Sequence, residues 1–288
     1  MTPDQYCQEK AARNGSTLYY STLFLPAGQQ RAVIALYALR HELDTVIEEC
    51  TDISVARARL GWWHDELSAL FQGNPTHPVT RALYPHLDAC SVRPEQLLGI
   101  VDAVNADLEQ TRYFDYASLQ RHCHAIEGTL AEICCNIFGP PDAAAIRYAR
   151  ELGLAVQLTK IIRDVGNHAR HGRIYLPVED LQRFNVKAAD ILNRRHSDDF
   201  RALMQFQAER ARASYARALE LLPTAQRRAQ RPGLIMAAIY YTLLNEIERD
   251  GFQVLHQRIG LTPLRKFWLA WKTWVTGGKV NLRPPKTR

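Results

Sequence analysis

Apolar and polar positions follow the period of an α-helix along most of this chain. Apolar residues recur at i, i+3 and i+4 in long stretches, which predicts helices over 27–50, 54–73, 93–110, 142–165, 198–222 and 233–255. Proline and glycine clusters such as 139–141 and 232–233 separate these stretches. No alternating run of strand length, linker or repeat period stands out. The sequence therefore predicts an all-α fold and one domain over residues 1–288.

Two of the predicted helices carry a polar stripe along one face. The first stripe consists of Tyr37, His41, Asp44 and Glu48, at spacings of four, three and four. The second stripe consists of Gln157, Lys160, Asp164 and His168. A polar stripe is most often the solvated outer face of a helix. Alternatively, carboxylates on two facing helices would share Mg²⁺ with a bound diphosphate, because this ion prefers one or two carboxylates plus phosphate oxygens.

Two details of the second stripe favour a binding site. Lys160 precedes Asp164, which is the weaker order for a surface ion pair on a helix. The turn at 170–173 then gathers two arginines and a histidine around Gly172, directly before Tyr175. Guanidinium groups bind phosphate oxygens with charge-assisted hydrogen bonds. We therefore expect Asp44 and Asp164 to face one cavity, and the bundle interior below to accept a hydrocarbon tail.

The segments that carry these residues resemble the squalene/phytoene synthase family. They read YYSTLFLP at 19–26, AVIALYALRHELDTVIEE at 32–49, LGLAVQLTKIIRDVGNHARHGRIYLP at 152–177 and IYYTLLNEIERDGFQVLHQRIGLT at 239–262. The GRIYLP turn and the TPLRKFWLAWKTW end are most similar to bacterial presqualene diphosphate synthases of the hopanoid branch. The resemblance implies a single-domain isoprenoid-synthase helical bundle with a central cavity. It also implies a prenyltransferase that joins two prenyl diphosphates head to head through a cyclopropyl intermediate.

The resemblance also implies roles for individual residues. The implied metal ligands are Asp44, Glu48, Asp164 and His168. The implied substrate-binding residues are Ser21, Tyr37, His41, Gln157, Lys160, Arg173 and Arg258. The implied catalytic residues are Tyr175, Arg163 and Tyr240. Mg²⁺ is the implied cofactor, joined by NADPH where the reaction continues to squalene.

Several positions depart from the family pattern. In the first motif, His41 replaces an arginine, Thr45 replaces an aspartate, and Glu48 takes the place of the closing aspartate. In the second motif, Lys160 replaces an amide, Asn167 replaces a glutamate and His168 replaces an aspartate. Glu127 replaces a small residue of the pocket. These changes leave two interpretations open. One is an enzyme that joins two farnesyl diphosphates to presqualene diphosphate or squalene. The other is a non-catalytic member that binds a prenyl lipid or a partner protein as an assembly factor.

Composition and charge narrow the partners and the compartment. The net charge of +6 comes from the end of the chain, because eight basic and no acidic residues lie from Arg258 onward. A nucleic-acid binder more often spreads basic residues over a folded face, so we expect no nucleic-acid partner. The polar N-terminus is unlike a secretory signal, and we expect a cytoplasmic protein with six reduced cysteines. The HCH cluster at 122–124 lacks the second ligand pair of a zinc site.

The last predicted helix, over 263–277, is rich in tryptophan and basic residues. It contains Trp268, Trp271 and Trp274 at intervals of three, with Arg265, Lys266 and Lys272 among them. Indole rings favour the headgroup region and basic side chains favour anionic lipid, which predicts peripheral contact with the inner face of a membrane. A terminal helix packed on the bundle is an equally good interpretation. The residues after it, 278–288, form a basic tail.

Overall fold

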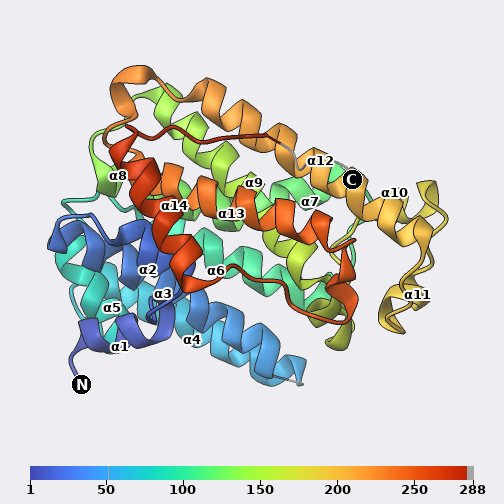
Figure 1. The fold of residues 1–288 in the computed structure, drawn as a ribbon. Helices are drawn as coiled ribbons and strands as arrows, with labels where there is room; N and C mark the ends of the chain where they lie inside the picture. Colours follow the sequence, from blue (N-terminus) through green and yellow to red (C-terminus); the bar gives the residue numbers. More distant parts are fainter. Residues whose placement is uncertain (51, 284–288) are drawn as a thin grey trace.

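The computed structural model describes residues 1–50 and 52–283, and they form an all-α bundle (Figure 1). The long helices lie where the periodicity predicts them: α3 Ala27–Glu49, α4 Ile53–Phe71, α6 Pro94–Glu109, α9 Ala143–Arg170, α12 Asp198–Leu221 and α13 Arg231–Arg249. No strand is found in the described part of the chain, where only the isolated bridge between Arg112 and Ile174 pairs extended backbone. The predicted fold class is confirmed.

Two helix ends differ from the prediction, and glycines explain both. Helix α9 continues through Gly166, because this residue packs against the backbone; a Cβ there would lie 2.5 Å from the carbonyl oxygen of Val254. It therefore provides a close approach and does not end the helix. Helix α13 stops at Arg249, because Gly251 and Phe252 adopt φ values of 68° and 57° and reverse the chain.

Shorter helices connect the long ones. They are α1 Pro3–Ala11, α2 Thr17–Thr22, α5 Pro78–Leu83, α7 Tyr116–Cys123, α8 Thr129–Phe138, α10 Val178–Arg183, α11 Ala188–Leu192 and α14 Pro263–Val275. Most of them span too few turns to show a period in the sequence. Single 3₁₀ turns lie at Tyr84–His86, Thr224–Gln226 and Gln253–Leu255, and a π-helical turn at His124–Gly128 joins α7 to α8.

The helices bury two apolar clusters. One is built around α9, α12 and α13, and the other around α3, α4, α6 and the N-terminal helices. Met236 of α13 packs against both clusters. The ribbon shows α14 crossing α13 and α2, and α10 and α11 at the opposite end from α1 (Figure 1). Helices α3 and α9, which carry the polar stripes, thus belong to different clusters, and the space between them is available for a site.

None of the helices in the described residues combines the length and the apolar character needed to cross a bilayer.

Candidate functional site

Two adjoining polar cavities and a small apolar pocket lie where the two apolar clusters meet. The carboxylate cavity, about 390 Å³, contains Asp44, Asp107 and Asp164 in its wall. The mixed cavity, about 530 Å³, lies between α3, α9, α13 and the 258–261 loop. Both are lined by Arg40, His41, Asp44, Lys160, Arg163 and Arg258, so they share a boundary of charged side chains. The apolar pocket, about 40 Å³, has room for only a few water molecules.

The structure brings nearly all the predicted site residues to these cavities. The carboxylate cavity is lined by His41, Asp44, Glu48, Gln157, Lys160, Arg163, Asp164, His168, Arg173, Tyr175 and Arg258. Tyr37 and Tyr240 line the mixed cavity. Asp44 and Asp164 thus share one cavity, and both Arg163 and Arg173 flank it, as the two stripes predict.

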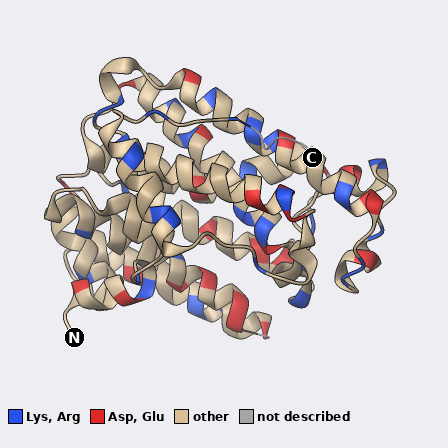
Figure 2. Ribbon diagram, viewed as in Figure 1, with Lys and Arg blue, Asp and Glu red and all other residues tan. Residues whose placement is uncertain are grey.

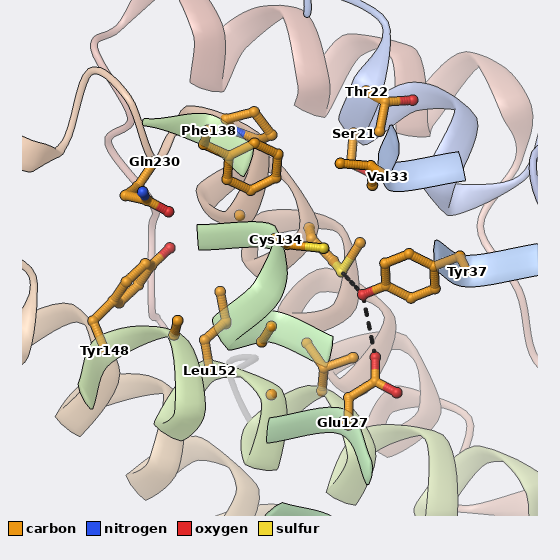
Figure 3. Close-up of a pocket in the computed structure, with 17 residues that line it drawn as sticks. Ser21, Thr22, Val33, Tyr37, Glu127, Cys134, Phe138, Tyr148, Leu152 and Gln230 are labelled. Atoms are coloured by element: carbon orange, nitrogen blue, oxygen red, sulfur yellow. Dashed lines mark hydrogen bonds between the residues drawn. The ribbon is translucent and has the colours of Figure 1, made fainter. Parts of the chain in front are cut away.

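Ser21 is the exception among the predicted residues. Its side chain is buried and donates to the carbonyl oxygen of Leu18, at 3.0 Å. It faces the apolar pocket, whereas Ser16 and Thr17 line the mixed cavity (Figure 3). Ser21 thus lies about one helical turn from the hydroxyls that line the mixed cavity, and its assignment to the diphosphate stays a prediction. The short α2 offers too little periodicity to fix which hydroxyl faces the charged residues.

On α3, Asp44 and His41 of the stripe each contact a side chain one turn away on the same helix. Asp44 forms an ion pair with Arg40, one turn before it on the same helix. The hydroxyl of Thr45 donates to the carbonyl oxygen of His41 at 2.9 Å and lies 3.3 Å from the ring Nδ1. Arg40 was not predicted, because the pattern placed the family arginine at position 41. Its guanidinium supplies the cation that His41 does not.

On α9, Asp164 lies between two arginines. The Nε atoms of Arg163 and Arg258 each donate to its Oδ1 at 2.9 Å, and Arg163 makes a second, closer contact with the other oxygen. Burial disfavours the charge, but the two guanidinium groups outweigh it and hold the pKa of Asp164 below its usual range. Asp164 is therefore ionised at neutral pH, and it holds two arginines at the boundary of the cavities.

Lys160 forms a buried ion pair with Glu127, which changes its predicted role. The ammonium lies 2.8 Å from Glu127 Oε2, and only 1% of Glu127 is exposed. Tyr37 donates to the other carboxylate oxygen at 3.4 Å (Figure 3), and the ring of Tyr240 lies 5.9 Å from the ammonium. Burial alone would lower the pKa of Lys160, but Glu127 reverses the shift and raises it. Lys160 is charged, but its ammonium already pairs with Glu127, whereas the resemblance implied that it would bind the substrate.

The Glu127–Lys160 pair separates the charged cavities from the apolar pocket. Glu127 lines the apolar pocket, and Lys160 lines both polar cavities. The π-helical turn His124–Gly128 places this carboxylate inward, and Gly153 of α9 packs directly against that turn. π-Helical turns are frequent at functional sites. No periodicity in the sequence announces such a turn, so the pairing was not predicted.

Asp107 of α6 organises the far wall of the carboxylate cavity. It accepts hydrogen bonds from Tyr113 at 2.7 Å and from Tyr175 at 3.1 Å, and His122 lies 3.3 Å away. The backbone carbonyl of Asp107 accepts from Arg173 at 3.0 Å. Asp107 thereby orients the two predicted residues of the 170–175 turn. The only sequence signal was one aspartate on the apolar face of α6.

Tyr175 and His168 are both neutral in this wall. Burial and the neighbouring Asp107 raise the pKa of Tyr175 well above its usual value, so the phenol keeps its proton. Burial lowers the pKa of His168 to about 4, and the imidazole packs edge-on against Tyr175 with ring centroids 4.7 Å apart. His168 therefore offers no positive charge to a phosphate at neutral pH. The assignment of His168 as a metal ligand, which requires a neutral imidazole, stays a prediction.

The residues that would hold Mg²⁺ do not fit the ion in this arrangement. Within residues 1–50 and 52–283, no three His, Cys, Asp or Glu side chains come together as a metal cluster. Asp44 is paired with Arg40, and Asp164 with Arg163 and Arg258. A magnesium ion would compete with these arginines for the carboxylate oxygens. Arg258 meets Asp164 through Nε, so its remaining N–H groups can still bind an anion beside that carboxylate.

Comparisons with known proteins show which family the chain resembles. Residues 11–265 match the sequence profile of the squalene/phytoene synthases. A phytoene synthase from Arthrospira platensis is 32% identical over 275 residues, which cover 91% of this chain and 89% of that protein. A 15-cis-phytoene synthase from Synechocystis sp. is 30% identical, with coverage of 93% and 84%.

Solved structures show the same bundle. A dehydrosqualene synthase in complex with a ligand superposes with a TM-score of 0.82 at 24% identity, covering 95% of this chain and 96% of the other. The squalene synthase HpnC from Alicyclobacillus acidocaldarius gives a TM-score of 0.71 at 25% identity, with coverage of 87% and 94%. A profile match over most of the chain, together with the two helices that carry the predicted residues to one cavity, shows that this protein belongs to the squalene/phytoene synthase family of prenyltransferases.

Proposed function

We propose that this protein joins two prenyl diphosphates head to head, with farnesyl diphosphate as substrate and presqualene diphosphate or squalene as product. The observation that carries the proposal is that Asp44 and Asp164 line one cavity with Arg163, Arg173 and Arg258. The relatives compared above are phytoene synthases, so geranylgeranyl diphosphate is the competing substrate.

The arginines are the proposed diphosphate-binding groups. Arg40, Arg163 and Arg258 lie at the boundary of both cavities, where a diphosphate reaches them together. Guanidinium groups bind phosphate oxygens in pairs and stay charged in a partly buried site. In the reaction known for the family, the allylic C–O bond breaks and the diphosphate leaves with the electron pair. Charge-assisted hydrogen bonds from arginine stabilise that departing anion.

The aromatic and apolar walls have a complementary role. Ile239, Leu243 and Leu261 line the mixed cavity beside Tyr240 and provide an apolar surface for a prenyl tail. The faces of Tyr37 and Tyr240 stabilise an allylic cation through cation–π attraction. Tyr175 keeps its proton on the phenolic oxygen and donates a hydrogen bond to Asp107. It therefore positions the wall and does not act as a base.

The test uses the purified full chain with farnesyl or geranylgeranyl diphosphate, each with and without Mg²⁺ and NADPH. Released diphosphate and the mass spectra of the lipids are measured. We expect diphosphate release with one substrate and a loss of at least tenfold in Arg258→Gln. Arg249→Gln is the matched control, because this arginine pairs with Glu246 and lines neither cavity. Release that is equal in both variants would contradict the proposed arginine site.

A non-catalytic role is the second candidate, and the ion pairs favour it. Asp44, Asp164 and Lys160 are each occupied by a side chain of opposite charge. Such a protein would bind a prenyl lipid or a partner protein without turnover. It is supported if no diphosphate is released under any condition while a prenyl diphosphate still binds.

A further inference from the structure

The outer face of α14 is apolar, and the described residues leave it uncovered. Leu264, Phe267, Trp268, Trp271 and Val275 are 78%, 43%, 51%, 48% and 54% exposed, respectively. Their spacing places them within one arc of about 100° on the helix. Ala270 and Thr273 lie on the other side and are buried. A contiguous apolar face of this kind on a folded protein marks a contact surface.

The three tryptophans therefore divide between two roles. Trp274 stacks on Phe24 with ring centroids 5.2 Å apart and lies under Arg231, so it holds α14 on the bundle. Trp268 and Trp271 point away from it. The interpretation of a helix packed on the bundle thus holds for Trp274, and the other two tryptophans remain exposed. Helix α14 is thus fixed in place and presents a rigid apolar face.

The basic residues of α14 also divide. Lys266 donates to the carbonyl oxygen of Gly15 at 2.8 Å and lines the mixed cavity, and Arg265 pairs with Glu246. Lys272 lies 4.8 Å from the ring of Trp268 and has no acidic partner within residues 1–50 and 52–283. The helix carries basic and no acidic residues (Figure 2). Its outward charge is therefore positive but small.

We propose that α14 lies in the surface of a lipid bilayer, with Trp268 and Trp271 at the level of the headgroups and Leu264 and Val275 among the acyl chains. Tryptophan favours this depth, because its ring is apolar and its N–H still reaches polar groups. An amphipathic helix binds lipid through its buried apolar area and through attraction to anionic headgroups. Here the apolar area dominates, since of the exposed basic residues on α14 Arg265 is paired with Glu246, and Lys272 remains to face the headgroups.

The position of α14 gives this contact a consequence. Its inner face, through Lys266, forms part of the mixed cavity. A helix with its side chains is about 10–12 Å across, so lipid docking holds the cavity within that distance of the bilayer. A prenyl diphosphate dissolved in the membrane would then have a short path to the arginines; this last clause alone rests on the proposed function.

The test compares three full-length proteins: wild type, the double variant Trp268→Ser/Trp271→Ser, and the control Trp62→Ser. Trp62 is 47% exposed on α4, so the control removes an equally exposed indole from another helix. Binding is measured by co-sedimentation with vesicles of phosphatidylcholine, alone or with phosphatidylglycerol, in the absence of prenyl diphosphate. Thermal melting confirms that all three proteins are folded.

We expect wild type and Trp62→Ser to bind alike, and the double variant to bind at least tenfold more weakly. Phosphatidylglycerol should strengthen wild-type binding by about fivefold for each basic side chain that reaches the surface. Equal binding by the double variant and wild type would overturn the proposal. So would a wild type that ignores vesicles but forms a dimer lost in the double variant, because a second copy would then cover the face. Enzymatic turnover is not measured, so an inactive protein leaves the result intact.

Discussion

At the scale of single residues, three carboxylates of this site each lie against at least one cation. Glu127 meets Lys160, Asp44 meets Arg40, and Asp164 meets two arginines. A buried carboxylate without a partner is costly, so the change to glutamate at 127 and the change to lysine at 160 make sense together. The two departures from the family pattern are thus one structural feature.

The Glu127–Lys160 pair predicts a strongly non-additive pair of substitutions. Glu127→Gln leaves a partly buried ammonium without its carboxylate and should lower the free energy of unfolding by about 3 kcal/mol. The double variant Glu127→Leu/Lys160→Met removes both charges and should recover most of that loss. Urea unfolding of wild type, Glu127→Leu, Lys160→Met and the double variant measures the coupling, and Glu127→Gln reports the loss of the carboxylate charge alone. Additive losses would show that the pair is not coupled in the folded protein.

His168 predicts a pH dependence of stability. Its folded pKa of about 4 lies below the value near 6.5 of an unfolded histidine, so below pH 6.5 the unfolded chain binds the extra proton. The folded state therefore loses stability as the pH falls from 6.5 to 4, by about 2–3 kcal/mol from this residue.

The measurement compares wild type with His168→Gln by urea unfolding in EDTA from pH 7 to pH 4. The variant should gain about 2–3 kcal/mol relative to wild type over this range. His171→Gln is the control, because this ring is exposed at the end of α9. A constant difference between wild type and His168→Gln would contradict the buried neutral imidazole.

At the scale of elements, α9 organises the site because small residues let other segments approach it. Gly153 meets the π-helical turn that carries Glu127, and Gly166 meets the backbone at 254–255. These contacts fix the position of Lys160 relative to Glu127 and of Asp164 relative to Arg258. Helix α14 also contributes to the site, because its Lys266 lines the mixed cavity.

Two glycine-to-alanine substitutions separate close packing from helix propensity. Gly166→Ala would place a Cβ 2.5 Å from a backbone oxygen and should destabilise the protein by about 1–3 kcal/mol. Gly61→Ala, at an exposed position of α4 with no atom within 4 Å of the new Cβ, should stabilise it by about 0.5–1 kcal/mol. Thermal and urea unfolding report both changes. Equal effects of the two substitutions would contradict the close approach at α9.

At the scale of the whole molecule, the site lies where two apolar clusters meet. Helix α3 packs in one cluster and α9 in the other, and Met236 contacts both. A ligand that bridges Arg40 on α3 and Arg163 on α9 therefore also ties the two clusters together. Binding should then stabilise the entire fold and not only the cavity walls.

This link predicts a thermal shift with inorganic diphosphate. At a concentration one hundred times the Kd, the ligand should add about 2.7 kcal/mol and raise Tm by roughly 5 °C. The shift should shrink as salt is added, because the arginines and the anion are partly solvated. The variant Arg163→Gln/Arg258→Gln should show little shift. A shift that needs Mg²⁺ would contradict direct binding by the arginines and indicate that metal displaces them from Asp44 and Asp164.

The sequence alone determined the class of fold, the long helices and the family. Helical periodicity depends only on which residues share a face, so the stripes on α3 and α9 could be predicted and were confirmed. The family resemblance and the stripes assigned Asp44, Asp164, Arg163, Arg173 and Arg258 to a common site, and the structure places all five at one cavity. Each of these features depends on residues within one segment of the chain, so the amino-acid sequence displays it directly.

Only the tertiary structure decided what each face meets. It showed that Lys160 meets Glu127 across a π-helical turn, that Arg40 and Asp107 belong to the site, and that Ser21 faces the apolar pocket. It also divided the tryptophans of α14 into one that packs and two that are exposed. Periodicity places a side chain on a face, but the partner opposite comes from a distant segment, and the free energy of that contact depends on burial that no local pattern contains.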